Sequence, residues 1–327
     1  MLMTLHEWII IAVSISLAAA TAALIFLGRR LEKLDPFREP AALKEGLGPK
    51  EWEHQMMELA REHGTVKWKS TRFIVGNYNQ TAYRKINRIR SAISRAPSGV
   101  IALIPSARWL FDNFQMMYRE IKKIKTTGTN YLSLPHLKTT EYRRYPRIYI
   151  IARKMVEISG GYLHEENIAL MIDAYQKVCP LTERELTVLP EMLGLCLMER
   201  IIDVSGEIIH VIKVKSRAEK FVRERLVEEE GFLDITPLLV KLDNTCADIS
   251  FHSHVIYLLK NRAVDDTGIA RYLAYHFGSG GDRPNAASIF KEEGRKASML
   301  ESSVRTLITS LRELNSINGE DLIEKLS

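Results

Sequence analysis

Apolar residues recur every three or four positions along most of this chain, and that spacing predicts helices. Residues 49–63 are typical, with Trp52, Met56 and Ala60 on one side of a helix that Gly64 would end. The alternation of polar and apolar residues that marks a strand is almost absent. Its best example, residues 210–214, lies inside a longer helical pattern. The sequence therefore predicts an all-α fold.

Glycines, prolines and polar residues separate the helical patterns. After residues 49–63, helices are predicted near residues 82–93, 105–125, 146–158, 165–178, 190–229, 236–244, 251–261, 267–277 and 286–315. Thr182 and Glu185 form a predicted capping box, and Asp265 or Asp266 caps a later helix. Residues 190–204 are apolar on more than one face, so this helix should be the most buried. The last helix carries a leucine-rich seam that suits either a partner helix or its own bundle.

Residues 8–27 contain no charged side chain and are long enough, at about 1.5 Å per residue, to cross a bilayer core of about 30 Å. Arg29, Arg30 and Lys33 follow this run directly. Such flanks predict an uncleaved transmembrane helix whose N-terminus lies outside, with the bulk of the chain cytoplasmic. We expect an anchor with its flanks in residues 1–34, a linker in 35–48 and a helical domain in 49–327, with a possible internal boundary near 230–235.

The net charge of +6 hides an uneven distribution. Residues 28–160 hold 26 Lys or Arg and 12 Asp or Glu, whereas residues 161–327 hold 20 and 27. The segment 65–95 contains no acidic residue. Its basic residues are Lys67, Lys69, Arg72, Arg84, Lys85, Arg88, Arg90 and Arg95. Close to a membrane anchor, this segment either lies against anionic lipid or forms a solvated helix face. We expect no nucleic-acid partner, because no nucleic-acid-binding motif accompanies the charge.

No motif for a metal, a cofactor or a nucleotide is present in the chain. Three widely spaced cysteines, Cys179, Cys196 and Cys246, are typical of reduced thiols rather than of disulfides or a zinc ribbon. Residues 278–281 are rich in glycine but follow a helix rather than a strand, so they predict a hinge and not a phosphate loop. We therefore assign no catalytic residue, no metal site and no cofactor.

One cluster of aromatic and polar residues remains as a candidate ligand site. It consists of Trp109, Asp112, Asn113, Arg144, Tyr145 and Arg147. Sugar sites combine an aromatic face with amides and guanidinium groups that bind hydroxyls. The same residues also suit a structural corner, with the tryptophan in the core and the arginines on the surface, so both interpretations stay open.

Several segments resemble, in order and at matching spacings, the region that precedes the glycosyltransferase in cyclic β-1,2-glucan synthases. They are Arg-Trp-Leu-Phe-Asp-Asn-Phe at 108–114, Tyr-Pro-Arg-Ile-Tyr at 145–149, Ala-Tyr-Gln at 174–176, Leu-Thr-Glu-Arg-Glu-Leu at 181–186, Leu-Pro-Glu-Met-Leu at 189–193, and residues 286–288, 303–314 and 321–323. The resemblance covers residues 49–327. It implies an association with a bacterial inner-membrane enzyme that builds β-1,2-linked glucan from UDP-glucose on the cytoplasmic side.

The sequence ends before the region that corresponds to the glycosyltransferase, so no catalytic residue of that family can be placed on it. We expect a membrane-anchored helical module without chemistry of its own, which scaffolds or regulates glucan synthesis. Its expected partners are the membrane, a glycosyltransferase and the glucan itself. Two alternatives stay open. The chain could be one component of a split, active glycosyltransferase, or a membrane-anchored interaction domain unrelated to glucan.

Overall fold

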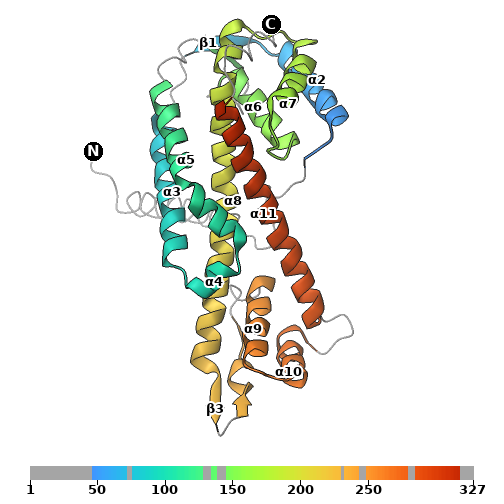
Figure 1. The fold of residues 1–327 in the computed structure, drawn as a ribbon. Coiled ribbons are helices and arrows are strands. Elements are labelled where there is room, and N and C mark those ends of the chain that lie inside the picture. The colour runs from blue at the N-terminus through green and yellow to red at the C-terminus, as the bar shows by residue number, and fades with distance from the viewer. Residues whose placement is uncertain are drawn as a thin grey trace, which may run out of the picture. The chain divides into compact units, whose positions relative to one another are not determined.

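The computed structural model describes residues 46–71, 76–127, 134–137, 145–229, 232–242, 248–278 and 284–316. The chain divides into two units, Met1–Pro40 and Ala41–Ser327, and every described residue belongs to the second. Helices dominate this unit, which confirms the predicted all-α class (Figure 1).

The elements follow one another as a series of helices with four short strands, which pair into two small sheets. They are α2 (Pro49–Thr65), β1 (Trp68–Thr71), α3 (Gly76–Arg95), α4 (Ser98–Ala102), α5 (Pro105–Thr127), β2 (Leu134–Leu137), α6 (Arg147–Ile158), α7 (Glu165–Gln176), α8 (Glu183–Arg225), β3 (Val227–Glu229), β4 (Phe232–Asp234), the 3-10 helix η2 (Thr236–Leu238), α9 (Ile249–Asn261), α10 (Asp266–Phe277) and α11 (Ala286–Ser316).

Helix α8 is the element on which the other helices pack. It is 43 residues long, and α3, α5, α6, α9 and α11 all contact it (Figure 1). Every residue from Met192 to Met198 is buried, as the apolar pattern on more than one face predicted. Pro190 lies inside this helix, which begins after the predicted capping box at Thr182.

Two hydrophobic clusters lie along α8. The first spans α2 to α7, most of α8 and the C-terminal half of α11. The second begins at Val214 on α8 and includes α9, α10 and the start of α11, with Ile289 in its interior. Helix α8 is unbroken and supplies residues to both clusters, so it connects the two hydrophobic cores.

The helix caps agree with the sequence. Thr182 Oγ1 accepts a hydrogen bond from the Glu185 amide, and the Glu185 side chain accepts one from the Thr182 amide, which is the predicted capping box. Asp265 caps α10 by accepting from the Gly268 amide at 2.8 Å. Of the two aspartates proposed for this role, Asp265 is therefore the cap.

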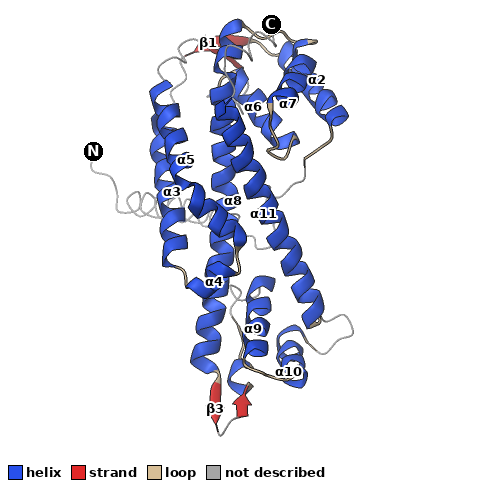
Figure 2. Ribbon diagram, in the orientation of Figure 1, coloured by secondary structure: helices blue, strands red, loops and turns tan. Residues whose placement is uncertain are grey.

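Two short antiparallel two-stranded sheets were not predicted (Figure 2). Strand β1 pairs with β2, and β3 pairs with β4. The strands are three or four residues long, too short for a period of two to stand out in the sequence. The helix predicted for residues 236–244 was also wrong, since the described part of that range, residues 236–242, contains only the 3-10 turn η2.

The leucine-rich seam of α11 packs into its own bundle, which decides between the two possibilities left by the sequence. Leu300, Val304, Leu307, Leu311 and Leu314 are all buried in the first hydrophobic cluster. Helix α11 contacts α5, α8 and α9. The seam is thus part of the core.

Within the part of the chain that the structure describes, no helix is both long and apolar enough to cross a membrane. The predicted span at residues 8–27 lies outside the described residues, as do the boundaries at 34 and 35.

Gly161 ends α6 in a backbone conformation that disfavours other residues, and the predicted stop at Gly160 and Gly161 is confirmed. Its φ is +84°, and a Cβ there would collide with the Leu307 side chain, 3.2 Å from its Cγ. We expect Gly161→Ala to lower the free energy of unfolding by about 2–4 kcal/mol, through left-handed strain and overpacking. Urea unfolding monitored by circular dichroism measures the change.

Gly206→Ala is the matched control for this prediction. Gly206 is exposed on α8, and a Cβ there would meet nothing within 4 Å. Alanine in an exposed helix interior should raise stability by about 0.5–1 kcal/mol. Equal effects of the two substitutions would contradict the role given to Gly161.

Candidate functional site

A buried ion pair joins two of the segments that carry the family resemblance. Arg147 donates from Nε to Glu185 Oε1 at 2.9 Å and from Nη2 to Glu185 Oε2 at 2.5 Å, and neither side chain is exposed. Further donations reach Cys179 Sγ and the Pro180 carbonyl, each at 3.2 Å. Burial alone would lower the pKa of Arg147, but the hydrogen bonds and charge of Glu185 outweigh it and raise that pKa. The guanidinium therefore stays charged.

Tyr175, from the Ala-Tyr-Gln segment, packs beside this ion pair. Its hydroxyl lies 2.8 Å from His63 Nδ1 on α2, and both side chains are buried. Burial raises the pKa of Tyr175 and, together with the charge of Arg147, lowers the pKa of His63 to about 4. The tyrosine is therefore neutral and the histidine uncharged at neutral pH. This arrangement ties α2 and α7 to the start of α6.

The predicted sugar cluster is not brought together. Trp109 and Asn113 lie on α5 and face α11: the Arg305 guanidinium lies 4.9 Å from the Trp109 ring centre, and Arg312 donates to Asn113 Oδ1. Trp109 is 18 residues from the C-terminal end of α5, the end from which the chain continues toward Tyr145 and Arg147. This is about 27 Å along the helix axis. Arg147 contacts Glu185 and, at 4.3 Å, the ring of Trp68 instead.

Of the other three members, the two that the structure describes, Asp112 and Tyr145, lie on or beside different elements. Asp112 is exposed on α5. Tyr145 precedes α6 and is 38% exposed. Arg144 lies outside the described residues. Of the five predicted residues that the structure describes, only Tyr145 lines the cleft described below.

The predicted basic surface is partly on the outer face of α3. Ala82, Ile86, Ile89 and Ile93 are buried on the inner face. Arg84, Arg88, Arg90 and Arg95 are exposed away from this inner face, and Lys85 is exposed toward the cleft described below. Lys67 and Lys69 are exposed near and within β1, and Arg72 lies outside the described residues. The lipid contact proposed for this surface is not tested by this arrangement.

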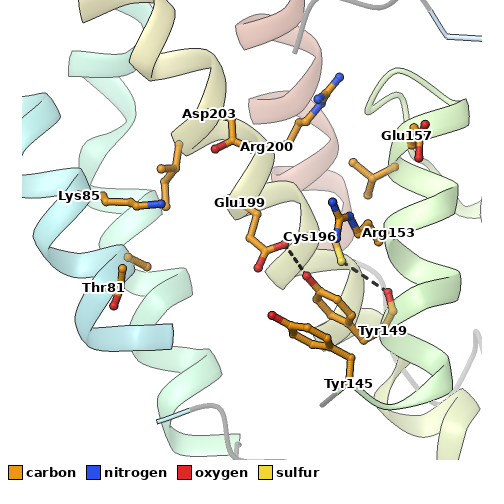
Figure 3. Close-up of a pocket in the computed structure, with 13 residues that line it drawn as sticks. Thr81, Lys85, Tyr145, Tyr149, Arg153, Glu157, Cys196, Glu199, Arg200 and Asp203 are labelled. Carbon is orange, nitrogen blue, oxygen red and sulfur yellow. Dashed lines mark hydrogen bonds between the residues drawn. The ribbon is translucent and has the colours of Figure 1, made fainter. Parts of the chain in front are cut away.

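A cleft of about 470 Å³ opens between α3, α6 and α8 (Figure 3). Tyr145 and Tyr149 stack in it, with ring centres 4.5 Å apart and planes 16° from parallel. The Tyr149 hydroxyl donates to Glu199 Oε2 at 2.8 Å. The charged side chains around the cleft are Lys85 on α3, Arg153 and Glu157 on α6, and Glu199, Arg200 and Asp203 on α8.

Burial in the cleft favours the neutral forms of several ionisable side chains. Burial raises the pKa values of Tyr149, Glu199 and Cys196. Burial also lowers the pKa of Arg200. Because the Cys196 pKa is raised well above its ordinary value, its side chain is a neutral thiol and not a nucleophile. The arrangement is suited to binding through stacking and hydrogen bonds.

A second hollow, of about 600 Å³, follows the contact between α5 and α11. Its polar side chains bind one another: Asn315 donates to Glu120 at 2.9 Å, and Lys123 donates to Asn315 at 3.0 Å. The described residues that line it include no aromatic ring. We therefore regard it as a polar seam between helices and take the α3–α6–α8 cleft as the candidate site.

No group of three or more His, Cys, Asp or Glu side chains is placed to hold a metal ion anywhere in the described ranges. His252 donates to or accepts from the Tyr272 hydroxyl at 2.9 Å inside the second hydrophobic cluster, and His254 is buried beside it on α9. Cys179 and Cys196 are buried free thiols, as the sequence predicted.

Sequence reasoning missed most of the residues in the cleft. Tyr145, Tyr149, Arg153 and Glu157 are each four residues apart, so they share one face of α6, and this spacing could have revealed them. The residues from α8 gave no such signal, because Glu199 and Arg200 stand in a stretch that reads as buried core.

No family model matches this chain, and no curated protein matches it either.

Proposed function

We propose that this protein is a membrane-anchored helical module that scaffolds or regulates a glycosyltransferase in cyclic β-1,2-glucan synthesis. Residues 8–27 serve as the anchor and residues 49–327 as the module, on the cytoplasmic side of a bacterial inner membrane. The glucose-transfer chemistry belongs to the partner enzyme.

The observation that carries this proposal is the meeting of the resembling segments in space. Arg147 comes from the segment 145–149, Tyr175 from 174–176 and Glu185 from 181–186, and all three lie around one ion pair. These three residues, spread over about forty positions of the chain, therefore belong to one structural unit.

The outer face of α3 supports the membrane part of the proposal. Basic side chains close to an anchor gain about 1 kcal/mol each from anionic lipid. Arg84, Arg88 and Arg95 are exposed on this helix and available for such contacts. We infer that this face lies toward the anionic membrane surface.

Deletion of the gene in the organism that carries it tests the proposed function. We expect the content of β-1,2-glucan in cell extracts, measured by linkage analysis, to fall by half or more. A plasmid that supplies the full-length chain should restore it. Unchanged glucan content in the deletion strain would contradict the proposal and favour an interaction domain unrelated to glucan.

A further inference from the structure

We propose that the cleft between α3, α6 and α8 binds a short, neutral segment of a β-linked glucose chain. The class of ligand, a neutral carbohydrate, is argued from the residues of the cleft. Its identity as a glucose chain rests on the proposed function.

The stacked tyrosines provide a platform for a sugar ring. Tyr149 is held in place because it is 3% exposed and its hydroxyl is bound to Glu199. Tyr145 stacks on Tyr149 and is 38% exposed at the edge of the cleft. A fixed, partly exposed aromatic ring offers the apolar face that a pyranose ring covers with its C–H groups.

The charges around the cleft offer an anionic ligand no net attraction. Three basic side chains and three acidic side chains line it, so they nearly balance. A site for a nucleoside diphosphate needs an excess of cations or a cluster of backbone amides at its phosphates. Glu157 and Asp203 would repel such a ligand.

The same side chains suit hydroxyl groups. Arg153 and Lys85 are donors, while Glu157 and Asp203 are acceptors, and they reach the cleft from three different helices (Figure 3). A sugar hydroxyl both donates and accepts, so neighbouring hydroxyls can use alternating donors and acceptors. The cavity of about 470 Å³ lies in the range of small-ligand sites and would hold a short segment only.

Calorimetric titration of the full-length chain tests this inference, with the protein in a detergent whose head group contains no sugar. The probes are a β-1,2-linked glucose trisaccharide, a β-1,4-linked glucose trisaccharide, UDP-glucose and inorganic phosphate. We expect the β-1,2-linked trisaccharide to bind, and UDP-glucose to bind no more tightly. Phosphate should give no heat.

Three variants make the test specific to the cleft. Tyr145→Ala should weaken trisaccharide binding about tenfold, since it removes the stacking surface. Asp203→Ala, at an exposed position, should weaken it about fivefold through a lost hydrogen bond. Tyr275→Ala is the matched control, because Tyr275 is 50% exposed on α10 and does not line the cleft. It should leave the affinity unchanged.

Three outcomes would overturn the inference. The first is that neither trisaccharide binds, and the second is that Tyr145→Ala and Asp203→Ala both bind the trisaccharide as the unmodified chain does. The third is that UDP-glucose binds at least tenfold more tightly than the trisaccharides. Tyr145-dependent binding of the β-1,4-linked trisaccharide in preference to the β-1,2-linked one supports the carbohydrate cleft and counts against the proposed function. Failure of the two proposals can thus be told apart.

Discussion

Arg147→Met lowers the free energy of unfolding by about 3–5 kcal/mol, the cost of leaving one charge of a buried ion pair without its partner. Glu185 is completely buried, and its two carboxylate oxygens are both bound to Arg147. Without the guanidinium, the carboxylate must be neutralised or hydrated, and either change opens the junction of α6 and α8. Urea unfolding monitored by circular dichroism gives the measurement.

Two further variants test the cause of this loss. Arg147→Met combined with Glu185→Leu removes both charges, so it should be less destabilising than Arg147→Met alone. Arg295→Met is the matched control: Arg295 is 56% exposed and pairs with Glu292 one turn earlier on α11. An exposed pair of this kind contributes less than about 1 kcal/mol. If Arg147→Met cost no more than Arg295→Met, the structural role of the ion pair would be refuted.

Acidification from pH 6.5 to 4 should lower stability by several kcal/mol, because three histidines are buried in their uncharged form. Burial lowers the pKa values of His63, His252 and His254 from 6.5 to about 4. Between these pH values the unfolded chain binds protons that the folded chain does not, so stability falls as the pH falls. Each histidine contributes on the order of 2 kcal/mol. The loss from these three groups levels off about one pH unit below 4, where they are protonated in the folded chain as well.

The surroundings of each histidine agree with this sign. His63 lies beside the Arg147 cation, and His252 lies 5.4 Å from the ring of His276. Burial and the nearby Lys215 lower the pKa of His254, and neither of its ring nitrogens has a hydrogen-bond partner. The Glu219 carboxylate, 3.8 Å from Nε2, acts in the opposite direction but does not outweigh burial.

One other histidine acts in the opposite direction. Asp248 raises the pKa of His210 through a hydrogen bond, so its contribution to stability is complete below pH 6.5 and is lost as the pH rises through the raised value. Because this contribution is already complete below pH 6.5, it does not change the loss expected between pH 6.5 and 4.

Denaturant unfolding at several pH values between 6.5 and 4 measures this dependence. His254→Leu should reduce its slope, because the variant has no group to protonate at that position. His54→Leu is the control, since His54 is 64% exposed on α2, and it should leave the slope unchanged. A stability that is constant over this pH range would contradict the buried, uncharged state of the three histidines.

Much of the fold could be predicted because helical spacing is a local property. The seam of α11, the capping box at Thr182 and the stop at Gly161 each depend on residues within a few positions of one another. The antiparallel pairing of β1 with β2 could not be predicted in this way. It joins strands about sixty residues apart, and Trp68 pairs with Leu137.

The candidate site was harder to predict because its residues come from separate helices. Proximity in sequence suggested that Arg147 and Tyr145 act together, yet Arg147 points into the core toward Glu185 while Tyr145 stacks on Tyr149 at the cleft. Two residues on a helix are on the same face when they are three or four apart, not two. Lys85 and Glu199 reach the cleft only through the packing of α3 on α8.

Complementation of the deletion strain tests most directly whether the cleft serves glucan synthesis. The measured quantity is the β-1,2-glucan content of strains that express, at equal protein levels, the unmodified chain, Tyr145→Ala or Tyr275→Ala. We predict that the unmodified chain and Tyr275→Ala restore the glucan, and that Tyr145→Ala restores less than half as much. Equal restoration by all three chains would contradict a role for the cleft.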